Sequence, residues 1–383
     1  MQKKILIISS LDDSTRAIYS ILNNLSDKFD FYFLGSRGNL YNFFTEKNWP
    51  RGKIFLFKNI LRFGAFKTRL FFIFKPLIQI YLFSILLVLK YKKKYQTIIL
   101  VNINEKILIS PLAKFLKIKV IWLESRDLEY SKLNKKIIKT FSKLARKNKI
   151  ICLNSFFQKK IEKLGIATDN IEVISPGIKK QHKKYQETLF SKLAKNENNQ
   201  VGRKFYTIGT ITDLNDKEKI ETLFSALKNS VDLITRVQLI IVGTGAYSPD
   251  NNPWAKWLAK KMGIETMVWF VTDTKNIKKW LDSFDIFVIS SRFLNLDDFK
   301  NTLYAMESEL APIVPYDLGY EDLVIDGENG FFYDINKSET LTENIIKYYK
   351  NKRLSIDLGK NAREHVEKNF QIEKSLEKIK ELL

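Results

Sequence analysis

Cysteine and histidine are nearly absent from this sequence. Its 383 residues include one cysteine and two histidines. Cys152 lies in the apolar stretch 150–153, where a buried core thiol is its simplest interpretation, and no disulfide can form within the chain. No zinc-binding His–Glu cluster, nucleophile elbow, Walker loop or Asp-x-Asp pair occurs. We therefore expect a reducing cytoplasmic setting and no resident metal or cofactor.

Acidic residues are scarce in the first half of the chain. Residues 1–200 hold 39 Lys and Arg against 14 Asp and Glu, whereas residues 201–383 hold 25 against 28. The net charge of +22 therefore arises in the N-terminal part. A basic face of this kind suits nucleic acid, an anionic bilayer or an acidic acceptor. Because no nucleic-acid-binding motif is present, we expect an anionic membrane surface as the partner and no nucleic acid.

A long uncharged run is also lacking, although residues 70–89 come close. They are almost continuously apolar but are interrupted by Lys75 and Pro76, and basic residues flank them on both sides. Three interpretations remain open: a transmembrane helix, a helix lying in the membrane interface with its lysines on the headgroups, or a buried core helix. The interruption disfavours a full span. The apolar core of residues 4–8 is too short for a signal peptide, so no secretion signal is expected.

Strand-like and helix-like segments alternate along the whole chain. With 45% apolar residues, 383 residues can form two domains that each bury a core. The polar stretch 195–200 indicates a linker between them. Apolar runs predict strands at residues 3–9, 29–34, 53–57, 96–101, 117–123, 148–153, 171–174, 205–209, 237–242, 267–271, 284–290 and 311–314. This alternation is typical of the α/β class with parallel sheets.

The segment 297–330 has the pattern of a ligand site. After the strand 284–290, it contains an acidic pair, a helix expected at residues 301–310, a short strand and a helical start expected at 318–322. Gly327 and Asn329-Gly330 then close the unit with a turn. The first-turn N–H groups of a helix are free to meet an anion. We therefore expect a ligand here, beyond the end of the strand.

This segment resembles the donor-binding segment of the retaining, GT-B-fold glycosyltransferases of family 4. Those enzymes typically show Glu-Gly-Phe-Gly, a second Glu eight residues after the first, Ala-Met, a Pro before a strand, Gly-Gly-x-x-Glu and Asn-Gly. The corresponding residues here are Asp297-Asp-Phe-Lys, Ala305-Met306, Pro312-Ile-Val, Gly319-x-x-Asp322 and Asn329-Gly330. Asp297 takes the place of the first glutamate. The second falls on Ala305, with Tyr304, Glu307 and Glu309 close by.

The resemblance extends to both sides of this segment. Pro176-Gly-Ile resembles the stretch with which these enzymes leave their first domain, and the final helix resembles the tail that crosses back onto it. It implies an N-terminal domain at 1–180, a linker at 181–204, a C-terminal domain at 205–365 and a returning helix at 366–383. The implied fold is GT-B: two Rossmann-like α/β domains that face a central cleft.

The resemblance also implies roles for individual residues. Asp297 would orient sugar hydroxyls, and Lys217 or Lys219 would hold the donor diphosphate and neutralise its developing charge. Thr210 stands where an arginine is usual. Glu124 ends a strand near the place of the family's histidine, where it either faces the cleft or serves as a helix cap or a partner for nearby lysines. The other donor-binding positions would be Gly209, Gly243, Val271, Thr272, Asp298 and Gly319.

The expected function is a metal-independent, retaining hexosyltransferase. It would move a sugar from a nucleotide-sugar to a saccharide or lipid-linked acceptor of the cell envelope, as a cytoplasmic protein peripheral on the inner face of the membrane. The alternative is a non-catalytic relative, a binding or scaffold protein with a degenerate donor site, because the usual arginine, second glutamate and histidine are replaced. A nucleotide-sugar epimerase is disfavoured, since its acid/base histidine and carboxylate set is not visible.

Overall fold

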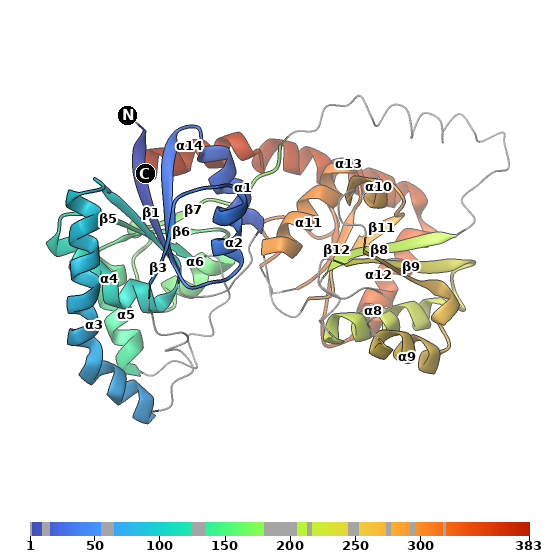
Figure 1. Cartoon of the computed structure of the whole chain (residues 1–383). Coiled ribbons are helices and arrows are strands. Elements are labelled where there is room, and N and C mark those ends of the chain that lie inside the picture. The colour runs from blue at the N-terminus through green and yellow to red at the C-terminus, as the bar shows by residue number, and fades with distance from the viewer. Residues whose placement is uncertain are drawn as a thin grey trace. The chain divides into compact units, whose positions relative to one another are not determined.

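The computed structural model describes residues 2–9, 16–54, 65–124, 135–179, 205–212, 217–243, 253–272, 277–291, 296–316 and 319–383. The chain divides into two units (Figure 1). The first is Met1–Pro176 with Ser375–Leu383, and the second is Gly177–Lys374. Each unit has its own sheet.

The first unit contains a seven-stranded sheet in the order β3-β2-β1-β4-β5-β6-β7, with every neighbouring pair parallel. The inner strand β1 is buried along its apolar run, as expected of a parallel strand covered on both faces. The strands are β1 (Lys3–Ser9), β2 (Phe29–Gly35), β3 (Arg51–Lys53), β4 (Thr97–Leu100), β5 (Lys119–Glu124), β6 (Lys149–Cys152) and β7 (Ile171–Val173).

Helices connect these strands. In α5, Ile137, Phe141 and Ala145 recur every fourth residue and form the buried face. The helices are α1 (Arg16–Leu25), α2 (Asn39–Glu46), α3 (Ala65–Tyr91), α4 (Ile103–Phe115), α5 (Lys135–Ala145) and α6 (Ser155–Glu162), with a 3-10 turn at Thr168–Asn170.

Helix α3 includes residues 70–89, for which the sequence allowed three interpretations. It packs on α4, which in turn contacts β5, and it is the outermost of these elements in Figure 1. Its buried residues include Phe71, Leu82, Leu86 and Leu89, whereas eight other large apolar residues of α3 are exposed. The interpretation as a fully buried core helix is therefore wrong.

The second unit has a six-stranded sheet in the order β10-β9-β8-β11-β12-β13, again with every neighbouring pair parallel. Two parallel sheets of this kind confirm the predicted α/β fold class. The strands are β8 (Tyr206–Thr212), β9 (Val237–Gly243), β10 (Val268–Val271), β11 (Ile286–Val288), β12 (Pro312–Pro315) and β13 (Phe331–Tyr333).

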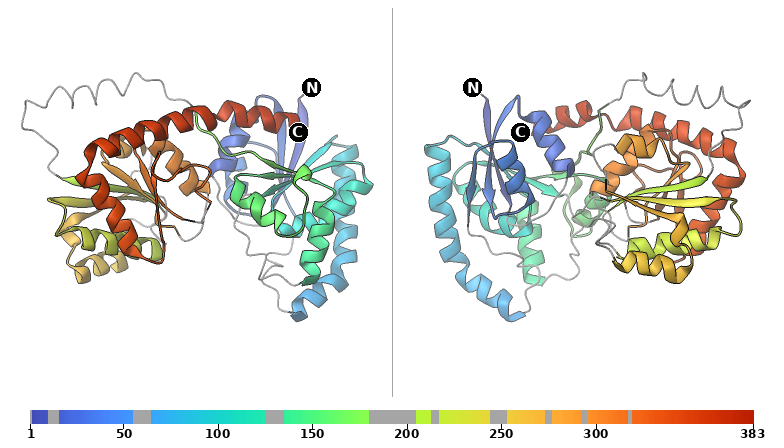
Figure 2. Two further views of the ribbon diagram at one scale, coloured as in Figure 1. Left: turned by 180° about the vertical axis from the view of Figure 1, so that it is seen from behind. Right: turned by 45° about the vertical axis from the view of Figure 1, so that its right-hand side comes forward.

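Helices lie on both faces of this second sheet. Helices α8, α9 and α12 cover one face, and α10, α11 and α13 cover the other (Figures 1 and 2). The bounds are α8 (Lys217–Ser230), α9 (Pro253–Met262), α10 (Ile277–Leu281), α11 (Leu296–Glu307), α12 (Ser338–Lys350) and α13 (Lys352–Asn369), with a 3-10 turn at Glu265–Met267.

The last helix, α14 (Ile372–Leu382), returns to the first unit from Ser375 onward. The Ser375 hydroxyl donates to the Ser175 carbonyl oxygen at 2.7 Å. Beside this crossing, a Cβ on Gly177 would lie 2.5 Å from the backbone nitrogen of Ile372. Glycine is therefore required where the two connecting segments meet.

Three expected elements differ from the observed ones. Helix α11 begins at Leu296 and ends at Glu307, five residues before and three before the expected limits of 301–310. Residues 319–323 form a turn instead of the expected helical start, and residue 318 lies outside the described part. Strand β3 is Arg51–Lys53, and most of the strand expected at 53–57 also lies outside it.

Candidate functional site

Buried polar side chains gather where β8 and β11 end. These strands are neighbours, but the chain leaves them in opposite directions: β8 leads through α8 to β9, and β11 leads through α11 to β12. Ligands of open α/β sheets bind beyond the carboxyl ends of the strands at such a switch point. The buried polar residues of this region are Thr210, Thr212, Lys219, Ser290, Ser291, Asp298, Asn301 and Thr302.

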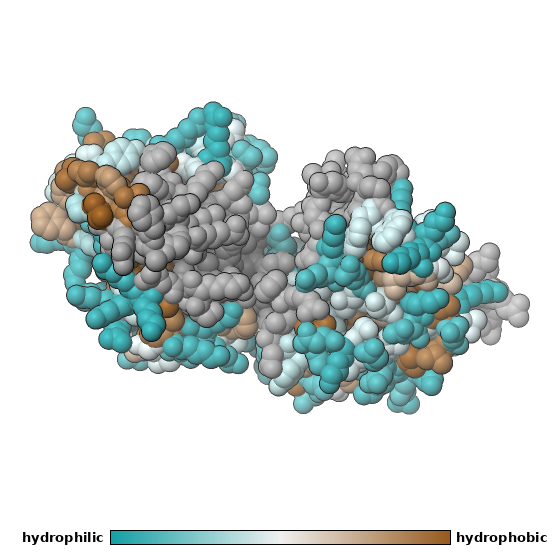
Figure 3. All heavy atoms as spheres, turned by 90° about the horizontal axis from the view of Figure 1, so that it is seen from below, coloured by the Kyte–Doolittle hydropathy of each residue, from teal (hydrophilic) through white to brown (hydrophobic). Residues whose placement is uncertain are grey.

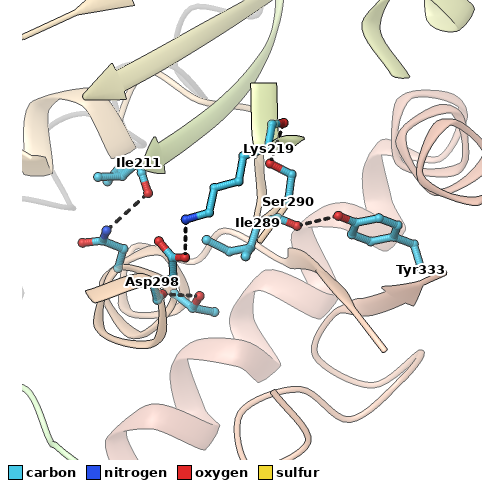
Figure 4. A network of polar contacts seen from close by, with 8 residues as sticks. Ile211, Lys219, Ile289, Ser290, Asp298 and Tyr333 are labelled. Atoms are coloured by element: carbon cyan, nitrogen blue, oxygen red, sulfur yellow. Dashed lines mark hydrogen bonds and ion pairs between the residues drawn. The ribbon is translucent and has the colours of Figure 1, made fainter. Parts of the chain in front are cut away.

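The centre of this region is an ion pair between two helix starts. The Lys219 Nζ, in the first turn of α8, lies 2.9 Å from the Asp298 Oδ2, in the first turn of α11 (Figure 4). The two side chains are only 5% and 4% exposed. Asp298 is well placed at a helix N-terminus, where backbone N–H groups favour an anion. Lys219 also lies at a helix N-terminus, where a positive charge is disfavoured. The Asp298 carboxylate offsets this unfavourable interaction.

Hydrogen bonds hold the ion pair in place. The Ser290 hydroxyl, just beyond β11, donates to the Lys219 carbonyl oxygen at 3.0 Å (Figure 4). The Thr302 hydroxyl donates to the Asp298 carbonyl oxygen at 2.8 Å. Asn301 donates through Nδ2 to the Ile211 carbonyl oxygen of β8 at 3.3 Å. The ends of both strands and the starts of both helices are thereby joined into one network.

Three buried hydroxyls near this network have no hydrogen-bond partner within the described residues: Thr210 Oγ1, Thr212 Oγ1 and Tyr320 OH. Tyr320 is fully buried, and its burial, together with the nearby Asp298 and Tyr333, raises the pKa of its hydroxyl well above the ordinary value. A buried hydroxyl without a partner is costly, by about 1–3 kcal/mol. A polar ligand reaching these hydroxyls would remove that cost.

The structure distinguishes the two lysines that the sequence offered. Lys217 is exposed, and its Nζ lies 5.0 Å from the centre of the Trp254 ring. Lys219 is buried within the network. The helical periodicity of α8 could have predicted the burial of Lys219, because this residue falls on the same helix face as the buried residues Leu223 and Leu227.

The two neighbouring aspartates have different surroundings. Asp298 is buried against Lys219, whereas Asp297 is partly exposed one residue earlier in the same helical turn. The assumption that the helix begins at Asn301 would have placed both in a loop. Their position inside the first turn follows from the stabilisation of acidic residues at helix starts.

The position of the second carboxylate contains no acidic side chain. Ala305 is fully buried in α11. Glu309 has a different task, because its Oε1 accepts from Arg363 of α13 at 3.1 Å. Of the nearby glutamates, Glu307 is buried.

Of the remaining donor-binding candidates of the second unit, all but Gly209 lie at the ends of strands or in the segment that follows. Gly243 and Val271 are the last residues of β9 and β10, and Thr272 is exposed beyond β10. Gly319 adopts a φ of 90°, which favours glycine. Gly209 has a packing reason instead, since a Cβ there would lie 2.0–2.4 Å from atoms of the Phe284 ring.

Glu124 lies in the first unit, at the end of β5. Its Oε1 is 2.6 Å from the Nζ of Lys106, which also donates to the Leu123 carbonyl oxygen at 2.9 Å. Both side chains of this ion pair are buried. This geometry favours the lysine-partner role for Glu124 over a role facing a cleft. Lys106 was not predicted as the partner of Glu124. A charged residue within the largely apolar segment 103–113 could have indicated a buried ion pair.

The described residues contain no obvious site for a metal ion. No group of three or more His, Cys, Asp or Glu side chains lies close enough together there to hold a metal ion. The absence of a metal requirement stays a prediction.

Comparison with known proteins gives a family match over the second half. Residues 191–365 match the family model described as "Glycosyl transferases group 1". A lipopolysaccharide core biosynthesis mannosyltransferase of Rhizobium leguminosarum bv. viciae is 31% identical over 118 residues, which is 30% of this chain and 33% of that protein. A putative glycosyltransferase of Bacillus subtilis (strain 168) is 27% identical over 151 residues, which is 39% of this chain and 38% of that protein. The matches thus span 33% of the length of one relative and 38% of the other.

Solved structures match over the whole chain. A glycosyltransferase from Rickettsia africae ESF-5 superimposes with a TM-score of 0.80 at 14% identity, covering 100% of this chain and 97% of that one. The Anabaena protein HepE in complex with UDP gives a TM-score of 0.73 at 14% identity, covering 99% and 98%. At this identity the likeness establishes the fold alone. The chain has the GT-B fold of glycosyltransferases, with two Rossmann-like domains.

Proposed function

We propose that this protein is a group 1 glycosyltransferase that moves a hexosyl residue from a nucleotide-sugar to a saccharide or lipid-linked acceptor of the cell envelope. The family match covers the second unit, where the buried network lies. A structural relative is described in complex with UDP, and the mannosyltransferase relative is described as acting in lipopolysaccharide core biosynthesis. The proposed location is cytoplasmic, on the inner face of the membrane.

The Lys219–Asp298 ion pair carries this proposal. A nucleoside diphosphate needs positive charge and hydrogen-bond donors, and the starts of α8 and α11 supply N–H groups beside the Lys219 ammonium. Asp298 fixes that ammonium in position. The hydroxyls of Thr210, Thr212 and Tyr320, which have no hydrogen-bond partner among the described residues, give further polar contacts for the donor.

The proposed reaction uses this charge on the leaving group. The bond between the sugar's anomeric carbon and the phosphate oxygen breaks, and the oxygen of an acceptor hydroxyl forms its bond to that carbon on the same face, with retention. The proton of the acceptor hydroxyl passes to the departing diphosphate. Lys219 and the helix dipoles neutralise the charge that develops on the departing diphosphate, without a divalent ion. Asp297, partly exposed at the start of α11, orients the sugar hydroxyls.

A specific observation favours the alternative of a non-catalytic donor-binding protein. Ala305 occupies the position of the second glutamate and is fully buried, and Glu309 is engaged by Arg363. Such a protein would bind a nucleotide-sugar and not turn it over.

Donor binding is tested by thermal unfolding of the full chain with UDP, GDP, ADP and their sugar conjugates. A ligand at about 100 times its Kd should add roughly 2.7 kcal/mol of stability. We expect Lys219→Ala to abolish the shift and Lys217→Ala, the matched exposed control, to retain it. Because Lys219→Ala leaves Asp298 without this partner, the Lys219→Ala/Asp298→Ala double variant is measured too. No shift with any nucleotide, or an equal shift in all variants, would contradict the proposed site.

A further inference from the structure

Helix α3 carries an apolar surface that no described part of the protein covers. We define the outward stripe as Leu70, Ile73, Phe74, Leu77, Ile80, Tyr81, Val88 and Tyr91, all of them exposed. At 100° per residue these side chains fall within an arc of about 120° on one side of the helix. The buried residues Phe71, Leu82, Leu86 and Leu89 lie on the opposite side. Helix α3 is therefore apolar on both faces, and the described residues of the unit cover only one of them.

The outward stripe is also free of charge. Among the side chains described between residues 70 and 91, the exposed ones outside the stripe are Pro76 and Ser84. The Ser84 hydroxyl donates to the Tyr81 carbonyl oxygen at 2.8 Å, so it can leave water without losing its hydrogen bond. In Figure 3, hydrophobic side chains gather at the left of the view, the side on which α3 lies in Figure 1.

Exposed lysines border one end of the stripe. Phe115, at the end of α4, is 76% exposed and its ring contacts Phe83 of α3. Around this point the exposed basic residues are Lys92, Lys93, Lys94, Lys114 and Lys117. No aspartate or glutamate occurs between Glu46 and Glu105, and Glu105 is itself buried. Residues 47–104, which include α3 and Lys92 to Lys94, therefore add basic side chains and no acidic ones to this surface.

We propose that the outward stripe of α3 lies in the interface of an anionic lipid bilayer, with the neighbouring lysines on the phosphate headgroups. A helix of 27 residues is about 40 Å long and can lie in the membrane plane, burying one face at the headgroup–acyl boundary. Tyr81 and Tyr91 suit that boundary, since an aromatic ring with a hydroxyl is stable between water and hydrocarbon.

Two other arrangements fit the contacts less well. Among the described residues, Ile73–Tyr91 is long and apolar enough to cross a membrane. Core helices of soluble proteins and signal sequences can have the same length and composition. A span would separate α3 from α4, which Gln79 holds by donating to the Leu108 carbonyl oxygen at 3.1 Å. A second copy of the chain packed on this stripe would bring two sets of exposed lysines together, which repel.

This inference does not rest on the proposed transfer reaction, because lipid binding is measured without donor or acceptor. The full chain is mixed with vesicles of phosphatidylcholine, with and without phosphatidylglycerol, and bound protein is separated by flotation. We expect binding to the anionic vesicles. The stripe variant Ile73→Gln/Leu77→Gln/Ile80→Gln should bind at least tenfold less tightly, because it removes apolar contacts from residues that are 64–68% exposed.

The matched control replaces three exposed apolar residues of the second unit, as Leu233→Gln/Trp257→Gln/Ile356→Gln. It should bind vesicles like the unchanged protein. Lys92→Gln/Lys114→Gln should lower affinity for anionic vesicles roughly 30-fold and leave binding to phosphatidylcholine unaltered. Circular dichroism confirms that each variant is folded.

Several results would overturn the inference. One is vesicle binding by the stripe variant equal to that of the unchanged protein, and another is no binding of the unchanged protein to anionic vesicles. A lipid-free dimer that the stripe variant converts to a monomer would identify a second copy as the occupant. Retention in cell membranes after alkaline carbonate extraction would identify a span.

Discussion

At the scale of single residues, the chemistry of the site depends on a buried charge that needs its partner. Lys219 and Asp298 are both almost fully buried and lie 79 residues apart in the sequence. Separating two charges of this kind is expensive, because a lone ion in the interior has lost its water. The ion pair that is proposed to bind the donor therefore also joins α8 to α11.

Replacing Asp298 tests this double role. We expect Asp298→Ala to lower the free energy of unfolding by about 3–5 kcal/mol, since Lys219 is left buried without this carboxylate. Asp297→Ala, in the same helical turn, should lower it by about 0.3–1 kcal/mol, the contribution of an acidic residue at a helix start. Urea unfolding followed by circular dichroism measures both. Equal effects of the two changes would show that the ion pair does not stabilise the fold.

Cys152 gives a second prediction at this scale. It is fully buried, and burial, assisted by the charge of Glu124, raises the pKa of its thiol far above the ordinary value. Only the thiolate reacts readily with alkylating reagents. We expect iodoacetamide to leave Cys152 unmodified in the folded protein at neutral pH and to modify it fully in urea, as measured by mass spectrometry. Rapid modification of the folded protein would contradict its assignment as a core thiol.

At the scale of elements, close packing explains a glycine that the sequence motif had linked to a ligand. Gly209 lies in β8, where Phe284 leaves no room for a Cβ. Its neighbour Thr210, in contrast, has a hydroxyl without a partner in the described residues. Adjacent positions of one strand thus have different tasks, because successive side chains point to opposite faces of the sheet.

A double-mutant cycle separates packing from ligand binding at Gly209. We expect Gly209→Ala to lower the free energy of unfolding by about 1–3 kcal/mol, through overpacking against Phe284. In a Phe284→Ala background the same change should cost less, so the two effects are coupled. Denaturant unfolding without nucleotide measures the cycle. A fully additive result would remove the packing explanation.

At the scale of the whole molecule, the fold could be predicted from the sequence more completely than the site. Runs such as residues 3–9 and 237–242 are long and apolar enough to identify buried parallel strands, and their order predicted two α/β domains. The start of α11 was misplaced, because two acidic residues were assigned to a loop although they stabilise a helix start. The partners of Lys219 and Glu124, and the burial of Tyr320, depend on tertiary packing that no local pattern encodes.

The proposed transfer reaction is tested most directly by turnover. The full chain is incubated with the nucleotide-sugar that stabilises it and with lipid or saccharide acceptors from cell envelopes, and release of nucleoside diphosphate and sugar incorporation are both measured. We predict transfer by the unchanged protein and a loss of roughly 100-fold or more in Lys219→Ala, the size expected when charge stabilisation of a leaving group is removed. Donor binding without transfer or hydrolysis, unaffected by Lys219→Ala, would contradict the proposal and favour a non-catalytic binding protein.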